Sequence, residues 1–339
     1  NNLGYTLGKP EITKLKDGTW VVIFASGYNN VSPGDGRGRL FVVNAATGSL
    51  IRTIDTGVGD TTTPSGLAQI RAWVDRTEIN NTSLRVYGGD NLGNVWRFDI
   101  NNDIGAAGYD AQLLATLRGG AGNAQPVTAR PELGLVNGNA VVYVGTGRYL
   151  GVTDLTDNSA QSLYAIKDSL GSTSLGNPRG ASFVQQTLTG GTCPADATVC
   201  DPSQTVRLGT SNAVDFATNN GWFIDLPVTR ERANTDPQLA LGTLVYTTNI
   251  IDPDACSVGG TSFINFFDYR TGGPVTSSTG VTSVLLGNAI ATRPTIVRLP
   301  SGKVISLTRL SDARTVVSRI PVGTVPGTTR RISWRELAN

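Results

Sequence analysis

Cysteines carry the clearest chemical signal in this chain, which has three of them and no histidine. Cys193 and Cys200 enclose a short polar loop, Cys-Pro-Ala-Asp-Ala-Thr-Val-Cys, and Asp201 and Pro202 follow directly. This spacing predicts a local disulfide that closes an exposed insertion, with two unrelated free thiols as the alternative. A disulfide places a protein outside the cytosol. Cys256 is left over, either as a buried thiol or as the partner of a cysteine elsewhere in a longer protein.

The lack of histidine excludes several catalytic sites. A Ser-His-Asp triad, a Cys-His pair and a zinc site with imidazole ligands all need a side chain that the sequence does not contain. The net charge is only +2 and the Lys and Arg residues are scattered, so the charge gives no reason to expect nucleic acid as a partner. No apolar run approaches the length of a membrane span.

Hairpins are the elements that must position the polar loops. The segment Tyr87 to Ile100 has strand-forming residues on both sides of a turn at Asp90 to Asn94, and it carries Trp and Phe in its return strand. The segment Gly38 to Ile54 repeats the arrangement around a turn at Asn44 to Gly48. Both hairpins are typical of the blades of quinoprotein-like β-propellers.

Composition agrees with an all-β fold. The 339 residues include 41 Gly and 16 Pro, and short strand candidates recur along the whole chain without a long helical pattern. We therefore predict one domain over residues 1–339, a β-propeller of about six or seven blades, each a four-stranded antiparallel sheet. The aromatic residues expected to pack between blades are Trp20, Trp96, Phe98, Trp222 and Phe267.

Seven blocks of sequence together resemble the C-terminal β-propeller domain of the PilY/PilC family, the type IV pilus tip-associated proteins. The resemblance covers nearly the whole chain in order. The blocks are Leu3 to Asn30, Gly38 to Ile51, Tyr87 to Ile100, Tyr143 to Gly151, Asp236 to Ile250, Cys256 to Val275 and Arg330 to Leu337.

The resemblance implies a non-enzymatic biogenesis and adhesion factor. Family members are large proteins of the periplasm, outer membrane and pilus tip, so this chain, which begins at Asn1, is expected to be the C-terminal part of a longer protein. Its propeller is expected to support pilus assembly, oppose retraction and promote twitching and attachment by binding minor pilins, while the full-length protein contacts host-cell or abiotic surfaces. The alternative is a ligand-binding or quinoprotein-like enzyme that uses its central funnel.

Calcium is the cofactor that the resemblance raises. Some family members carry an EF-hand-like loop before the strand that corresponds here to Val86 to Asp90. This chain has Asp75, Glu78 and Asn80 there, without the glycine and the acidic spacing that such a loop needs. We therefore expect no bound cofactor at this position. Asp154 and Asp157 are a weaker alternative for calcium.

Exposed loops and aromatic residues are the candidates for partner binding. The polar insertions Val31 to Arg37 and Asp103 to Gln112 are expected to project from one rim of the propeller. We expect both insertions to be removable without loss of the fold. The partner-binding residues that we predict are Asp35, Arg37, Trp73, Asp103, Asp110 and Trp334.

Overall fold

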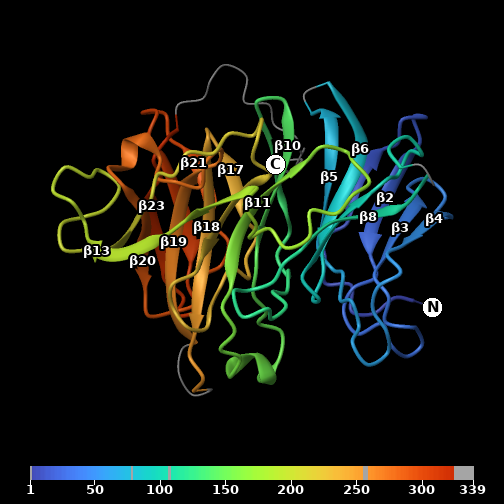
Figure 1. Cartoon of the computed structure of the whole chain (residues 1–339), viewed down its shortest axis with the longest axis horizontal. Helices are drawn as coiled ribbons and strands as arrows, with labels where there is room; N and C mark the ends of the chain where they lie inside the picture. The colour runs from blue at the N-terminus through green and yellow to red at the C-terminus, as the bar shows by residue number, and fades with distance from the viewer. Residues whose placement is uncertain (1, 78, 106–107, 255–258, 324–339) are drawn as a thin grey trace.

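The computed structural model describes residues 2–77, 79–105, 108–254 and 259–323. These residues form an all-β protein with two single-turn 3-10 helices, η1 (Val152–Leu155) and η2 (Thr276–Ser278). The sheets follow one another in chain order, from blue on one side of Figure 1 to red on the other. The prediction of an all-β propeller is confirmed.

The first two blades are simple four-stranded meanders. Each runs outward from its first strand, and a single parallel pair, Lys14 with Thr82, joins the two into one sheet. The first blade contains β1 (Glu11–Lys14), β2 (Trp20–Ala25), β3 (Arg39–Asn44) and β4 (Leu50–Asp55). The second contains β5 (Ile70–Arg76), β6 (Asn80–Gly89), β7 (Asn94–Phe98) and β8 (Ala111–Thr116).

A connection within the third blade supplies a hairpin to the fourth blade. The third is β9 (Glu132–Val136), β10 (Asn139–Gly145), β11 (Ser162–Asp168) and β15 (Gly221–Asp225), with β12 (Phe183–Gln186) parallel to β15. The fourth is β16 (Glu231–Arg232), β17 (Gln238–Ala240), β18 (Thr243–Ile251), β19 (Gly260–Asp268) and β20 (Val281–Gly287). Its outer edge comes from β13 (Leu188–Thr192) and β14 (Thr205–Gly209), which precede β15 in the chain.

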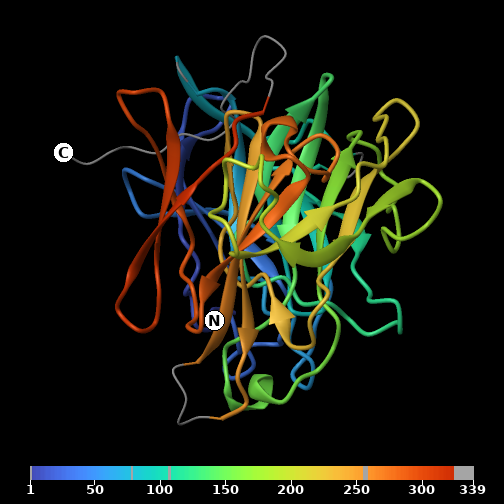
Figure 2. The same ribbon diagram turned by 90° about the vertical axis from the view of Figure 1, so that its left-hand side faces the viewer.

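A three-stranded sheet ends the described chain. It consists of β21 (Thr295–Arg298), β22 (Val304–Arg309) and β23 (Thr315–Arg319), and Figure 2 shows it in red beside the other sheets. Four hydrophobic clusters separate five blades in the described residues. The blade number of six or seven and the single domain over residues 1–339 stay predictions.

Most of the predicted aromatic packing is confirmed. Trp96 and Phe98 lie in the cluster between the first two blades, and Trp222 and Phe267 lie in the cluster between the third and fourth. The prediction for Trp20 is wrong, because its side chain is 49% exposed. It opens β2, where Val21 and Ile23 face the core, and strand alternation therefore turns Trp20 to solvent.

Both predicted hairpins form. In the first, Asp90 is fully buried, and its carboxylate accepts hydrogen bonds from the N–H groups of Leu92 and Asn94 at 3.0 and 2.9 Å and from Trp96 Nε1 at 3.0 Å. One carboxylate thus fixes both the turn and the aromatic residue of the return strand. In the second, Asn44 Oδ1 accepts the N–H groups of the turn.

The predicted disulfide is present. Cys193 and Cys200 are bonded, with their Cα atoms 5.9 Å apart. The surrounding insertion is not a plain loop, since it contains the β13–β14 hairpin at the edge of the fourth blade. Cys200 is buried in the cluster that this blade shares with the last sheet.

Removing this disulfide is expected to destabilise the protein moderately. The bonded cysteines are seven positions apart, and the entropy of closing such a loop corresponds to about 2–3 kcal/mol. The double variant Cys193→Ala, Cys200→Ala should lose that amount in denaturant unfolding, and reductant should lower the midpoint of the wild type alone. An unchanged midpoint in both experiments would contradict the prediction.

Candidate functional site

The innermost strands of the blades line a central funnel. β1 contacts β5, β5 contacts β9, and β9 contacts β17, although these strands are far apart in the sequence. The first residues of these strands, and those just before them, bring charged side chains to the axis. They are Lys9, Glu11, Arg71, Arg130, Glu132, Asp236 and Arg293, which we call the funnel network.

Ion pairs connect the first three blades across the funnel. Arg130 Nη2 pairs with Glu11 Oε1, and Arg130 Nε donates to the carbonyl oxygen of Ile70 at 2.9 Å. Arg71 Nη2 lies 3.1 Å from Glu132 Oε1. All four charged side chains are less than 20% exposed. These contacts therefore combine charge with partial burial, where a pair is screened less by water.

Asp236 extends the network to the fourth blade and the last sheet. Its Oδ2 lies 2.6 Å from Lys9 Nζ and 3.8 Å from Arg293 Nη1, and its Oδ1 accepts the N–H of Arg130 at 3.0 Å. Burial alone would raise the pKa of Asp236, but the Lys9 ammonium and the donors of Arg130 lower it below its usual value. This contact holds together Lys9 and Asp236, which are 227 positions apart in the sequence.

The funnel network neutralises its own carboxylates. Each of Glu11, Glu132 and Asp236 has at least one cationic partner, so these groups do not form an open set of hard oxygen ligands. In the described part of the chain no three His, Cys, Asp or Glu side chains gather as a metal site. The disulfide lies at the outer edge of the fourth blade, away from the axis. This funnel is suited to tie blades together.

The lowered pKa of Asp236 predicts a dependence of stability on pH. Its stabilising contribution is present above the pKa of the unfolded state, about 3.9, and is lost as the pH falls through the lower folded value. The difference in free energy of unfolding between the wild type and Asp236→Asn should thus be large near about pH 7 and shrink below about pH 4. Denaturant unfolding of both proteins at several pH values checks this. A difference that stays constant with pH would contradict it.

The degenerate calcium loop is only partly described. Asp75 lies in β5, and Asn80 Oδ1 accepts the N–H and the hydroxyl of Thr82 at 3.1 and 2.6 Å. Glu78 lies outside the described residues. Asn80 thus has a structural role at the start of β6, and the expectation of no calcium at this position stays a prediction.

Asp154 and Asp157 each have hydrogen-bond partners of their own. The Asp154 carboxylate accepts Arg148 Nε at 2.7 Å and the N–H groups of Leu150 and Gly151 at 2.8 and 3.1 Å. Although burial acts in the opposite sense, these hydrogen bonds lower the pKa of Asp154. Asp157 instead caps its own turn through the N–H of Ser159. Both residues thus shape this loop, and calcium at this pair stays an untested alternative.

The predicted loops lie on opposite rims, so the expectation of one shared rim is wrong. Val31 to Arg37 follows the C-terminal end of β2, on the rim at the lower edge of Figure 1. Asp103 pairs with Lys16, which lies in the β1–β2 turn at the other end of that strand. Strand direction decides this placement, because successive connections of a meander alternate between its two ends.

The first predicted loop is anchored to the blade. Asp35 binds both terminal nitrogens of Arg39 at 2.6 Å, and these hydrogen bonds lower the pKa of Asp35. Arg37 is exposed and lies 3.9 Å from Asp55. Removing Val31 to Arg37 would therefore disturb the first blade. Point substitutions on the rim are a better test of partner binding than deletion of this loop.

The second predicted loop is also tied down. The N–H groups of Asp103 and Ile104 donate to Asp99, and the carbonyl oxygen of Asp110 accepts the N–H of Asp99. The predicted range runs into the protein's regular structure, since Gln112 belongs to β8.

The prediction of Trp73 as a docking residue is wrong. Trp73 lies in β5 and is 8% exposed; its ring packs against Tyr87, and the Arg85 guanidinium covers it at 4.3 Å from the ring centroid. Its neighbours Ala72 and Val74 are buried too, so β5 is covered on both faces at this point. Trp334 and Cys256 lie outside the described residues.

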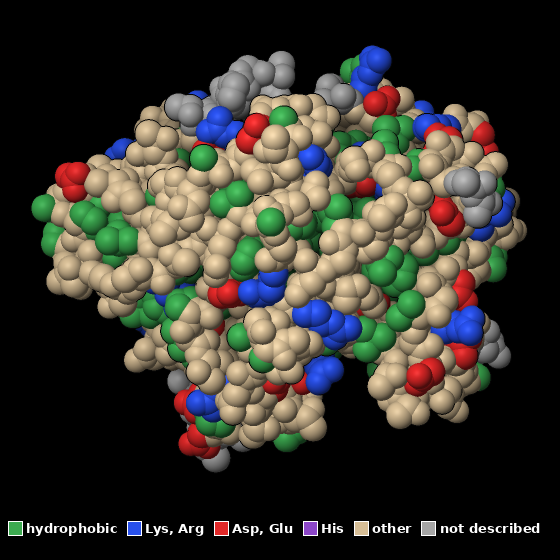
Figure 3. Space-filling view, viewed as in Figure 1, with side chains coloured by type: hydrophobic (Ala, Val, Ile, Leu, Met, Phe, Trp, Pro, Cys, Tyr) green, Lys and Arg blue, Asp and Glu red, His purple; other side chains and the backbone are tan. Residues whose placement is uncertain are grey.

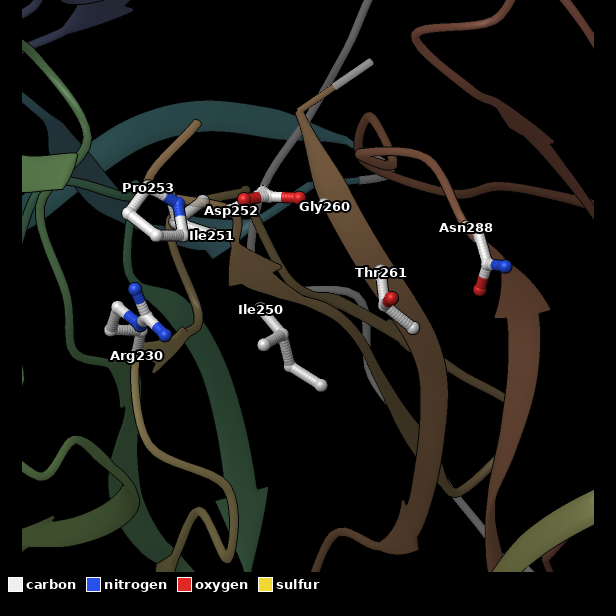
Figure 4. A pocket seen from close by; sticks show the side chains of 8 residues that line it. All are labelled: Arg230, Ile250, Ile251, Asp252, Pro253, Gly260, Thr261 and Asn288. Carbon is white, nitrogen blue, oxygen red and sulfur yellow. The ribbon is translucent and has the colours of Figure 1, made fainter. Parts of the chain in front are cut away.

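One pocket on the lower rim was not anticipated. It has a volume of about 490 Å³ and lies where β18 and β20 end and β19 begins. Figure 4 shows Arg230, Ile250, Asp252, Thr261 and Asn288 around it. This pocket could not be predicted from the sequence, because its residues come from three separate connections and contain no motif.

The architecture and the funnel define the class of this protein. Its sheets follow one another as the blades of a propeller, and ion pairs connect the blades where their innermost strands meet. The PilY1 β-propeller domain family matches residues 1–193, more than half of the chain. The chain belongs to the PilY1 β-propeller family.

The names of two related proteins agree with this family membership. The type IV pilus biogenesis factor PilY1 homolog of Xylella fastidiosa is 29% identical over 306 residues, 84% of this chain and 20% of that protein. Type IV pilus biogenesis factor PilY1 of Pseudomonas aeruginosa is 28% identical over 309 residues, 80% of this chain and 26% of that protein. The chain thus spans about a fifth to a quarter of these relatives. They are named as biogenesis factors, in agreement with the prediction of a non-enzymatic domain.

A solved structure shows the same fold. The crystal structure of the Pseudomonas aeruginosa PilY1 C-terminal domain matches with a TM-score of 0.74 at 21% identity, over 94% of this chain and 72% of that one. Among the described residues, no helix has the length and apolarity needed to cross a membrane.

Proposed function

We propose that this domain is an extracytoplasmic interaction module of a type IV pilus biogenesis factor and that it binds minor pilins at the pilus tip. The membership in the PilY1 β-propeller family carries the proposal. The relatives' printed names support the role in pilus biogenesis, and the disulfide supports a location outside the cytosol. Assisting assembly, opposing retraction and promoting twitching and surface attachment are the activities that we assign to the full-length protein.

The lower rim is the surface that we assign to the partner. Its loop after β10 exposes three apolar residues within four positions, Tyr149 at 37%, Leu150 at 49% and Val152 at 82%. In Figure 3 the lower edge of the molecule is divided by a notch between two lobes. Large apolar side chains held in solvent at such a place favour a role in contact with another protein.

This loop is held rigidly, which favours binding. Asp154 fixes its start, and the fully buried Arg232 donates to the carbonyl oxygens of Arg148 and Asp157 at 2.8 and 2.7 Å. Gly147 makes room for Arg232, since a Cβ atom there would lie 2.5 Å from the Arg232 Cβ. A loop fixed before binding loses little conformational freedom when the partner docks.

Substitutions on the exposed loop test this surface in cells. We expect the full-length protein with Leu150→Ser and Val152→Ser to be exported and folded, yet to support fewer surface pili and less twitching than the wild type. The matched control is Leu50→Ser with Val317→Ser, which are 58% and 60% exposed on edge strands of other blades. Electron microscopy of pili and motility assays measure the effect. Equal piliation and motility of loop and control variants would refute the assignment of this rim.

A further inference from the structure

Arg230 presents a guanidinium without a protein partner to the lower-rim pocket. Among the described residues, its side chain makes no ion pair or hydrogen bond, and its Nε is buried without an acceptor. Burying the polar atoms of a cation without partners is costly, because the lost hydration is not replaced. The guanidinium is therefore available to donate hydrogen bonds to an anionic group from outside the chain.

The neighbouring carboxylate cannot serve Arg230, because it is already used. Glu231 is buried, and its two oxygens bind Arg207 Nη1 and Nη2 at 2.7 and 2.9 Å. Glu231 Oε1 also accepts the hydroxyl of Thr248 at 2.6 Å. The bidentate pair with Arg207 thus leaves the adjacent Arg230 uncompensated.

Backbone contacts fix the position of Arg230. It has a φ of 65°, in the left-handed region that non-glycine residues seldom adopt, and its carbonyl oxygen accepts the N–H of Ile251 at 3.3 Å. Ile250, the next residue along the pocket wall, pairs with Glu231 on one side and with Thr261 on the other. The backbone of Arg230 is therefore held at the end of a regular sheet.

The rest of the pocket offers donors, an apolar wall and one acid. The side chains of Thr261 and Asn288 make no hydrogen bond within the described part of the chain, so both can donate to a ligand. Ile250 supplies apolar surface. Asp252 accepts the N–H of Asp254 with Oδ1 at 3.0 Å, and its other oxygen can accept an N–H from a ligand.

The neighbouring cations of the rim have partners within the chain. Arg148 Nε lies 2.7 Å from Asp154 Oδ1, and Arg232 donates to the carbonyl oxygens of Arg148 and Asp157. Arg230 is therefore the cation that an acidic ligand at this pocket would pair with.

We infer that this pocket binds an acidic side chain of a partner protein, with the carboxylate on Arg230 and a neighbouring backbone N–H on Asp252. A guanidinium with nearby hydroxyl and amide donors matches the geometry of a carboxylate. The inference deepens the proposed function, on which it rests for the partner: an exposed Asp or Glu of the pilin that docks on the lower rim.

A capped peptide tests the pocket without any pilin. The probes are acetyl-Ala-Leu-Glu-Ala-amide and the same peptide with Gln in place of Glu, which both lack a free terminal carboxylate. In NMR titrations we expect the Glu peptide to shift the signals of Thr261 and Asn288, and the Gln peptide to bind roughly tenfold or more weakly, as expected for a lost charged hydrogen bond. Arg230→Gln should bind the Glu peptide more weakly than the wild type by the same factor, whereas Arg230→Lys should keep part of the affinity.

Arg37→Gln is the matched control, since Arg37 is exposed and lies 3.9 Å from Asp55 on the first blade. It should bind the Glu peptide like the wild type. Arg230→Gln should melt like the wild type, because the guanidinium has no internal partner among the described residues to lose. Absence of binding by the Glu peptide, or equal binding to the wild type and Arg230→Gln, would overturn the inference.

Immobilised cognate minor pilins separate the two proposals. Loss of pilin binding in Arg230→Gln, together with loss of peptide binding, supports both. A wild-type domain that binds the peptide but no pilin refutes the proposed function while the pocket stands. An affinity for the pilins that Arg230→Gln does not change refutes the inference while the proposed function stands.

Discussion

Replacing Glu231 by Gln is expected to lower the free energy of unfolding by about 3–5 kcal/mol, the range for breaking a buried ion pair on one side. Glu231 and Arg207 have side chains 0% and 4% exposed, and the pair is bidentate. The Arg207 guanidinium also lies over the Phe263 ring at 3.8 Å from its centroid, so it cannot turn to water without disturbing the blade. The variant leaves this cation buried without a counter-ion.

The loss should spread because the pair belongs to a network. Thr248 links Glu231 to Asn265, which in turn accepts the hydroxyl of Ser283 at 2.7 Å, so four strands of the fourth blade are connected. Guanidinium chloride unfolding followed by tryptophan fluorescence measures the effect. Asp312→Asn, which breaks the exposed pair with Arg314, is the control and should leave the midpoint unchanged. A Glu231→Gln midpoint close to that of the control would show that the buried pair is not important for stability.

Asp168→Asn is expected to cost a similar amount, about 3–5 kcal/mol, and to loosen the contact between the second and third blades. Asp168 lies in β11, and its carboxylate accepts Arg97 Nη1 at 2.7 Å and the hydroxyl of Tyr87 at 2.6 Å. Both donors belong to the hairpin Tyr87 to Ile100. Burial, together with the neighbouring Asp168 carboxylate, also raises the pKa of the Tyr87 phenol, so this hydroxyl stays a donor.

The asparagine variant removes the charge that Arg97 requires but keeps the size of the side chain. The Arg97 side chain is 3% exposed, and among the described residues it has only the carbonyl oxygen of Gly171 as a second acceptor. Denaturant unfolding gives the stability loss, and hydrogen exchange should show faster exchange in β7 and β11 than elsewhere. The idea fails if exchange accelerates evenly along the chain, or if the loss is no larger than for Asp312→Asn.

Local signals in the sequence were sufficient for the two hairpins and the disulfide. The turn residues Asp90 and Asn44 act within a few positions, and alternation in strands depends on neighbours only, so both could be read directly. The spacing of Cys193 and Cys200 is equally local. Trp20 and Trp73 show the limit: alternation determines a side chain's face, but which face is covered depends on the neighbouring blade.

The candidate sites were harder to predict because their residues meet only in three dimensions. Lys9 and Asp236 are joined across 227 positions, and the pocket assembles from three connections. The exchange of the β13–β14 hairpin to the fourth blade leaves no periodic signal either. The shared rim of Asp35 and Asp103 could have been rejected from the sequence, by counting strand directions through the predicted hairpins.

Direct binding between the purified domain and its cognate minor pilins is the measurement that tests this account most directly. By biolayer interferometry, we expect the wild type and Asp312→Asn to bind the immobilised pilin complex equally, and the Leu150→Ser, Val152→Ser variant to bind at least about tenfold more weakly, as for the loss of a few buried apolar side chains. Folded wild-type domain without any affinity for the complex would contradict the account, as would a loop variant that binds like the wild type.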